Sequence, residues 1–121
     1  MIPSSVVWAE EAGPDGAPLI VLVHGSMDRS AGLLKLSRRL DEVHRVVRYD
    51  RRGYGRSAPH AGPFRMDEQV ADLVSLLDGR PATVFGHSYG GDVALALADR
   101  HPELVPAVGI YEAPLPWLDW W

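Results

Sequence analysis

The stretch Val84-Phe85-Gly86-His87-Ser88-Tyr89-Gly90-Gly91 decides the fold of this chain. An apolar run, residues 82–85, leads into a Gly-x-Ser-x-Gly turn, and an alanine-rich segment, residues 92–100, follows it. Buried parallel strands favour β-branched and aromatic residues, which the apolar run supplies. Gly86 and Gly90 remove the side chains that would crowd a sharp turn. The stretch therefore predicts a strand, a tight corner and a helix, with Ser88 at the apex.

Apolar patterns on either side of this corner predict the other elements. Leucines recur at helical spacing in residues 28–40, and a second amphipathic pattern covers residues 66–77 and ends at Gly79 in a C′ position. The predicted strands are residues 5–10, 19–23, 43–49 and 105–111, and the turn residues 13–16 have the composition of a hairpin turn. Strands that alternate with helices predict an α/β fold, a mostly parallel sheet of about five strands with helices on both faces.

Composition excludes several classes of function. The chain has 121 residues, 46% of them hydrophobic, and a formal net charge of -4 with no basic stripe that would bind nucleic acid. It has no cysteine, which excludes disulfides and thiolate metal sites. The longest apolar run, residues 19–23, is too short to span a membrane, and no signal-peptide pattern opens the chain. We therefore expect a cytoplasmic protein without a membrane span.

A serine at such a corner has two interpretations. A glycine-rich turn with an incidental serine should occur by chance in about a few per cent of chains this long. The alternative is acyl transfer, which needs a nucleophile, a base, a group that orients the base, and donors for the oxyanion. The strand-turn-helix context favours Ser88 as the nucleophile and the amide of Tyr89 as one donor. The turn after residues 19–23 should supply the second amide, from Ser26 or, less favoured, Met27.

Three motifs in this order resemble the α/β-hydrolase fold superfamily, in particular its single-domain esterase, lipase and non-haem haloperoxidase-like members. They are His24-Gly25-Ser26, residues 50–57 and residues 86–91. The resemblance implies a Ser-acid-His triad, hydrolysis of a small-molecule acyl substrate, and no metal or organic cofactor. It implies that residues 50–57 are a structural loop. A serine at the apex argues against the haloalkane dehalogenase and epoxide hydrolase branches, which use aspartate there.

The chain departs from the pattern of this superfamily after the predicted corner. In the superfamily the acid and then the histidine follow the serine in the sequence. In this chain none of the five histidines lies beyond residue 101, and none is placed to act as the base. Glu112 follows the last strand and is a candidate acid, although the same position is only structural in some members. Residues 114–121 resemble the lead into the family's cap, so Trp117 and Met27 are candidates for the near wall of the substrate pocket.

We therefore expect residues 1–121 to be the N-terminal part of one α/β-hydrolase domain, ending at the start of the cap region and before the catalytic histidine. The strand 105–111 would then be a bare apolar edge, open to the missing C-terminal half as a partner. The alternative is a non-catalytic or split hydrolase half that binds a ligand or a protein partner through this edge and the tryptophans.

Overall fold

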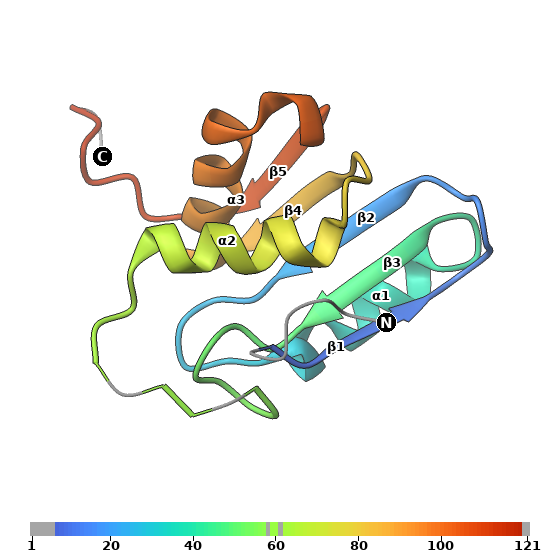
Figure 1. Ribbon diagram of the computed structural model, residues 1–121, viewed down its shortest axis with the longest axis horizontal. Helices are drawn as coiled ribbons and strands as arrows, with labels where there is room; N and C mark the ends of the chain where they lie inside the picture. The colour runs from blue at the N-terminus through green and yellow to red at the C-terminus, as the bar shows by residue number, and fades with distance from the viewer. Residues whose placement is uncertain (1–6, 58, 61, 120–121) are drawn as a thin grey trace.

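Five strands form a single sheet in the residues that the structure, a computed structural model, describes: 7–57, 59–60 and 62–119. The strands are β1 (Ala9–Ala12), β2 (Leu19–Val23), β3 (Arg45–Tyr49), β4 (Thr83–His87) and β5 (Ala107–Tyr111). Their order across the sheet is β1-β3-β2-β4-β5, as Figure 1 shows. Only β1 runs antiparallel to its neighbour; the other pairs are parallel. The predicted α/β fold with a mostly parallel sheet is confirmed.

Helices cover both faces of the sheet (Figure 1). On one face lie α2 (Met66–Leu77) and α3 (Tyr89–Arg100), and α1 (Leu34–Leu40) lies on the other. Alternate residues of β2 explain the two layers, because side chains along a strand point to opposite faces. Val21 and Val23 pack with α2 and α3, whereas Leu22 packs with the α1 layer. All three side chains are fully buried.

The helix boundaries follow from local sequence. Met66–Leu77 is one helix, as predicted, and it ends where Asp78 and Gly79 both adopt positive φ angles of 51° and 79°. Residues 28–40 were predicted as one helix, but this prediction is wrong at its start. A short 3-10 turn, η1 (Ser30–Leu33), comes first, and the α-helix begins at Leu34.

The N-terminal strand departs from two predictions. The turn at residues 13–16 does not close a hairpin, because β1 pairs with β3 and not with β2. The strand also begins later than predicted, at Ala9, and residues 5 and 6 of the predicted strand lie outside the described residues. Two long-range ion pairs accompany this pairing: Glu11 binds Arg45 at 2.8 Å, and Glu10 binds Arg48. Both arginines belong to β3.

The opposite edge of the sheet is open. β5 pairs with β4 on one side only, and Val108, Ile110 and Tyr111 are exposed apolar side chains on it. Trp117, downstream of β5, is 63% exposed. The described residues therefore present the bare apolar edge that the sequence predicted, at the end of the sheet farthest from β1.

Candidate active site

Ser88 lies at the corner between β4 and α3, in a strained backbone conformation. Its φ and ψ angles are 55° and -127°, a region that residues with a side chain rarely adopt. Two backbone hydrogen bonds hold the corner: the Ser88 amide donates to the Tyr111 carbonyl and the Gly91 amide to the Ser88 carbonyl, both at 2.8 Å. The surrounding structure thus fixes the unusual backbone that projects the Ser88 side chain.

Glycines let the elements meet closely around this corner. A Cβ atom added to Gly86 would collide with the backbone of Gly90 at the start of α3. One added to Gly90 would collide with the carbonyl oxygens of Val23 and His24 at the end of β2. Because these obstacles are backbone atoms, no side-chain rotation could relieve them. The two glycines therefore set the distance between the corner, its helix and the neighbouring strand.

The turn after β2 borders the Ser88 side chain. A Cβ atom built on Gly25 would lie 2.9 Å from the Ser88 Cβ and 3.5 Å from its Oγ. Ser26 and Met27 follow on the surface, and Met27 has a φ of 57° and is 95% exposed. The structure therefore brings Ser88 and the start of the Ser26–Met27 turn together at the carboxyl ends of β2 and β4.

The amides named as oxyanion donors flank this junction. Tyr89 is the first residue of α3, so its amide has no partner within the helix. Within the described residues, the amides of Tyr89 and Ser26 donate no hydrogen bond to any other group. Acyl transfer requires unpaired donors of this kind for its oxyanion.

The fully buried, neutral side chain of His24 holds the turn that follows β2 next to Ser88. Its Nε2 accepts a hydrogen bond from the Arg51 amide at 2.9 Å, so the ring proton must lie on Nδ1. The Nδ1–H then donates to the Gly25 carbonyl at 2.7 Å. Burial lowers the pKa of His24, and the positive charge of Arg51 lowers it further. The imidazole is a structural brace and is not available as a base for Ser88.

Arg51 is the residue whose position the sequence did not reveal. Its side chain is only 1% exposed, and its Nε donates to the His24 carbonyl at 2.9 Å. The guanidinium lies 4.7 Å from the centre of the Tyr54 ring and 5.1 Å from that of Tyr89. Nη1 donates to Gln69 at 3.2 Å. A buried cation thus connects the loop after β3 to both segments that frame Ser88.

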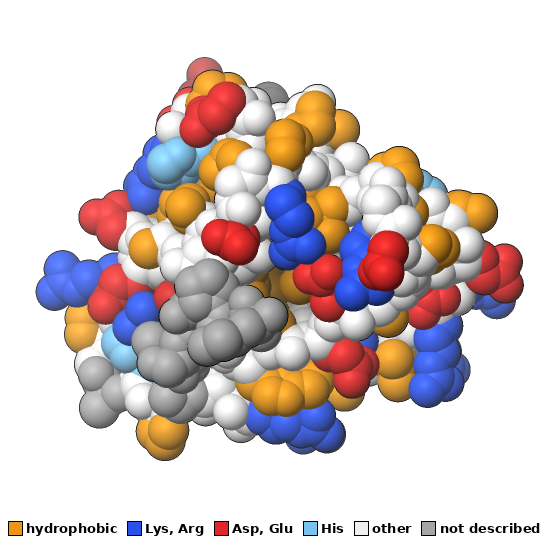
Figure 2. Space-filling view, turned by 45° about the vertical axis from the view of Figure 1, so that its right-hand side comes forward, with side chains coloured by type: hydrophobic (Ala, Val, Ile, Leu, Met, Phe, Trp, Pro, Cys, Tyr) orange, Lys and Arg blue, Asp and Glu red, His pale blue; other side chains and the backbone are white. Residues whose placement is uncertain are grey.

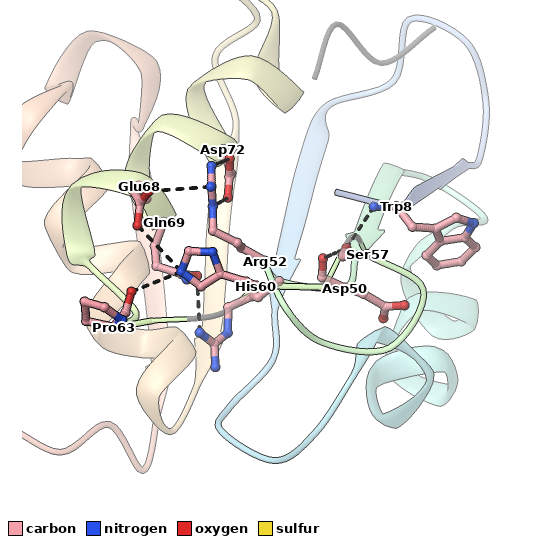
Figure 3. A network of polar contacts seen from close by, with 10 residues as sticks. Trp8, Asp50, Arg52, Ser57, His60, Pro63, Glu68, Gln69 and Asp72 are labelled. Carbon is pink, nitrogen blue, oxygen red and sulfur yellow. Dashed lines mark hydrogen bonds and ion pairs between the residues drawn. The ribbon is translucent and has the colours of Figure 1, made fainter. Parts of the chain in front are cut away.

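The rest of the loop, residues 50–57, is held by polar contacts in Figure 3. Arg52 binds Asp72 of α2 through two hydrogen bonds of 3.0 and 3.1 Å. On the other side, the Ser57 hydroxyl donates to the Asp50 carbonyl and accepts from the Trp8 amide. Burial raises the pKa of the Asp50 carboxyl, but hydrogen bonds from the Arg56 and Ser30 amides outweigh it, and the pKa is lowered. These contacts agree with the structural role expected for this loop.

The remaining predicted residues have exposed side chains. The Glu112 side chain is 69% exposed and faces His87, whose Nε2 lies 3.8 Å from its Oε1. The His87 ring in turn stacks on Tyr111 with the ring centres 5.6 Å apart. Trp117 is exposed downstream of β5. Within the described residues, no histidine forms a hydrogen bond with the Ser88 hydroxyl.

Across residues 7–57, 59–60 and 62–119, no three His, Cys, Asp or Glu side chains are grouped so that they could hold a metal ion. No helix in the same ranges combines the length and apolar character of a bilayer span.

Comparisons with known proteins agree with this geometry. A family model described as alpha/beta hydrolase fold matches residues 18–121. Lipase LipV of Mycobacterium tuberculosis is 36% identical over 99 residues, which cover 79% of this chain and 37% of that protein. Epoxide hydrolase 4 of Mus musculus is 33% identical over 110 residues, covering 87% of this chain and 31% of that protein.

A solved structure shows the same arrangement of elements. The crystal structure of an alpha/beta hydrolase from Sphaerobacter thermophilus superposes with a TM-score of 0.79 at 32% identity, covering 93% of this chain and 43% of that chain. This chain therefore spans about a third of the length of the two curated relatives, 37% and 31%, and corresponds to their N-terminal part.

Proposed function

Because the chain belongs to the α/β-hydrolase fold family, we propose that it is the nucleophile-bearing part of a serine hydrolase that acts on carboxylic esters or related acyl substrates. The observation that carries the proposal is the strained Ser88 corner, with the Gly25 turn packed directly against it. Family membership alone would not separate the branches, since one relative bears the name of an epoxide hydrolase. The serine at position 88 supports acyl chemistry through an alkoxide-type nucleophile.

In the proposed reaction, the Ser88 Oγ attacks the substrate carbonyl carbon while a base takes the hydroxyl proton. The carbonyl oxygen becomes an oxyanion that accepts hydrogen bonds from the Tyr89 and Ser26 amides. The tetrahedral intermediate collapses to an acyl-enzyme and releases the alcohol, which takes the proton back. Water then attacks the acyl-enzyme by the same steps and releases the carboxylic acid. Each oxyanion donor should contribute about 3 kcal/mol of transition-state stabilisation.

The base and its orienting acid complete the proposal. His24 is committed to the Arg51 amide and the Gly25 carbonyl, which argues against it as the base. We assign the base to a histidine in the part of the domain that follows β5 in longer relatives, with Glu112 as one candidate for the acid. Exposed Met27 and Trp117 would form the near wall of an apolar acyl pocket.

A fluorophosphonate probe tests the nucleophile, because it reacts only with an activated serine. The experiment should use the protein with any sequence that continues beyond residue 121. We expect labelling of the wild type and none of Ser88→Ala. Labelling of Ser88→Ala at the wild-type rate would overturn the assignment.

Position 26 offers a matched pair of variants for the oxyanion donor. Ser26→Ala keeps the backbone amide and should label and turn over acyl substrates like the wild type. Ser26→Pro removes the amide and should lower kcat about 100-fold or more. Equal kcat values for the two variants would exclude the Ser26 amide as a donor.

The second candidate is a non-catalytic or split hydrolase half that binds a partner or an apolar ligand. The open β5 edge, with exposed Val108, Ile110 and Trp117, favours it. The same probe separates the two functions: a folded protein that no fluorophosphonate labels, with or without Ser88, supports the binding function.

A further inference from the structure

A cavity whose lining does not include Ser88 lies at the β1–β3 edge of the sheet. Its volume is about 400 Å³, and its wall includes three arginines, Arg29, Arg48 and Arg56, and one tryptophan, Trp8. These residues come from separate parts of the chain: the segment before β1, the turn before η1, β3, and the loop after β3. Cavities that bind small molecules generally have volumes of about 300–1,000 Å³.

One of the three arginines is already paired. Arg48 is 8% exposed, binds the Glu10 carboxylate and donates to the Ser30 hydroxyl at 3.2 Å. The Arg48 side chain is therefore a fixed part of the cavity wall. Its charge is largely balanced by Glu10, so the ligand preference depends on the other two.

Arg29 and Arg56 have no such partner. Within the described residues, neither guanidinium lies within 4.0 Å of a carboxylate. Among the described residues of the cavity wall, Asp50 alone carries a carboxylate, and its two oxygens accept from the Ser30 amide at 2.7 Å and the Arg56 amide at 2.8 Å. Asp50 is thus held by the backbone, and the two guanidinium groups remain available to a ligand.

Trp8 orients one of these cations. The Arg56 guanidinium carbon lies 4.5 Å from the centre of the Trp8 ring, and that of Arg48 lies 6.0 Å from it. An arginine stacked on an aromatic face keeps its N–H groups in a plane and free at the edge. Ala31 and Leu34 extend the apolar part of the wall beside this stack.

We propose that this cavity binds the phosphate group of a small phosphorylated organic molecule. A phosphate monoester carries a charge of about -1.5 to -2 at neutral pH, and the two unpaired guanidinium groups outnumber the one carboxylate on the wall. Arginine binds phosphate oxygens through paired N–H donors. The apolar wall at Trp8 and Leu34 would contact the organic part of the ligand.

The local charge contrasts with the rest of the molecule. The whole chain has a net charge of -4, and acidic and basic side chains are interspersed on the face that Figure 2 shows. A cavity with three arginines and one backbone-bound carboxylate is therefore a local exception. It lies at the sheet edge opposite β5, so it is independent of the proposed acyl chemistry and of any strand that would pair with β5.

Isothermal titration calorimetry tests the proposal with inorganic phosphate, phenyl phosphate and benzoate as probes. We expect phenyl phosphate to bind more tightly than inorganic phosphate, because its ring contacts the apolar wall, and benzoate to bind most weakly. Binding should weaken as salt is added. Arg29→Gln and Arg56→Gln should each weaken phenyl phosphate binding about tenfold or more.

Two controls make the result specific. Arg39→Gln removes the same charge from an exposed position on α1 outside the cavity and should leave the dissociation constant unchanged. Ser88→Ala should also leave it unchanged, because the cavity does not include the corner. No binding of either phosphate to the folded wild type, or equal binding to the Arg29, Arg56 and Arg39 variants, would overturn the proposal.

Discussion

His24 and Arg51 exchange two hydrogen bonds between the ends of β2 and β3. The Arg51 amide donates to His24 Nε2, and the Arg51 Nε donates to the His24 carbonyl, each at 2.9 Å. Because Gly25 follows His24 and packs against Ser88, this pair holds the turn that borders the proposed nucleophile. The loop after β3 thus supports the turn beside Ser88 through His24.

Gly25→Ala should impair Ser88 while leaving the fold intact. The new methyl group would lie 2.9 Å from the Ser88 Cβ, so either the serine or the turn must shift. A displacement of about 1 Å at a catalytic centre can cost about 100-fold in rate. We expect the fluorophosphonate labelling rate to fall by about that factor, with the far-ultraviolet circular dichroism spectrum unchanged. An unaltered labelling rate would show that the turn does not constrain Ser88.

His24 should make stability depend on pH. Burial lowers the pKa of the folded imidazole below its ordinary value of 6.5, so the unfolded chain binds more protons as the pH falls. The free energy of unfolding should therefore decrease as the pH drops below about 6.5 and reach a plateau below the folded pKa. His24→Gln keeps an acceptor for the Arg51 amide but cannot titrate. In urea titrations from pH 5 to 8 this variant should show a shallower decrease, and an identical slope would contradict the assignment.

Asp92 should reduce stability at neutral pH. Its Oδ1 is buried without a hydrogen-bond partner within the described residues, and burial raises the pKa of the carboxyl above 3.8. A raised pKa means that the folded state disfavours the charged form, so the destabilisation is absent below pH 3.8 and develops as the pH rises through the folded pKa. Asp92→Ala should raise the melting temperature at pH 7 more than at pH 3. A lower melting temperature at pH 7 would indicate a partner for the carboxylate.

The β5 edge should cause self-association of residues 1–121. An unpaired strand edge with exposed apolar side chains can pair with another chain. Val108 is 39% exposed on this strand, and a lysine there should oppose such pairing. We expect light scattering of the wild type to rise with concentration and that of Val108→Lys to rise less. Lys35→Ala, a change on α1, serves as the control and should behave like the wild type.

Local sequence predicted the central elements of the fold well. The apolar run of β2 matches the predicted residues 19–23, and α2 matches the spacing of its apolar residues. In contrast, β1 pairs with a strand more than thirty residues away, where Glu10 and Glu11 meet two arginines of β3. Turn composition carries no information about such distant pairs, which is why the predicted hairpin was wrong.

In the candidate site, the corner at Ser88 could be predicted from the sequence, but the buried position of Arg51 could not. The order of glycine, serine and glycine around position 88 indicated the corner, because few other sequences allow that backbone. The burial of Arg51 could not be anticipated, since charged residues in glycine-rich loops are usually exposed. Its position depends on the combined packing of His24, Gln69 and Tyr89, which come from three separate elements.

The backbone at Ser88 carries a cost in stability for any residue with a side chain. Glycine adopts a φ of 55° with a ψ of -127° without penalty, whereas a serine there costs about 1–3 kcal/mol. Ser88→Gly should therefore fold more stably than the natural chain. Folding alone would favour glycine at this position, so a hydroxyl held there at a cost in stability is consistent with the proposed role of Ser88 as a nucleophile.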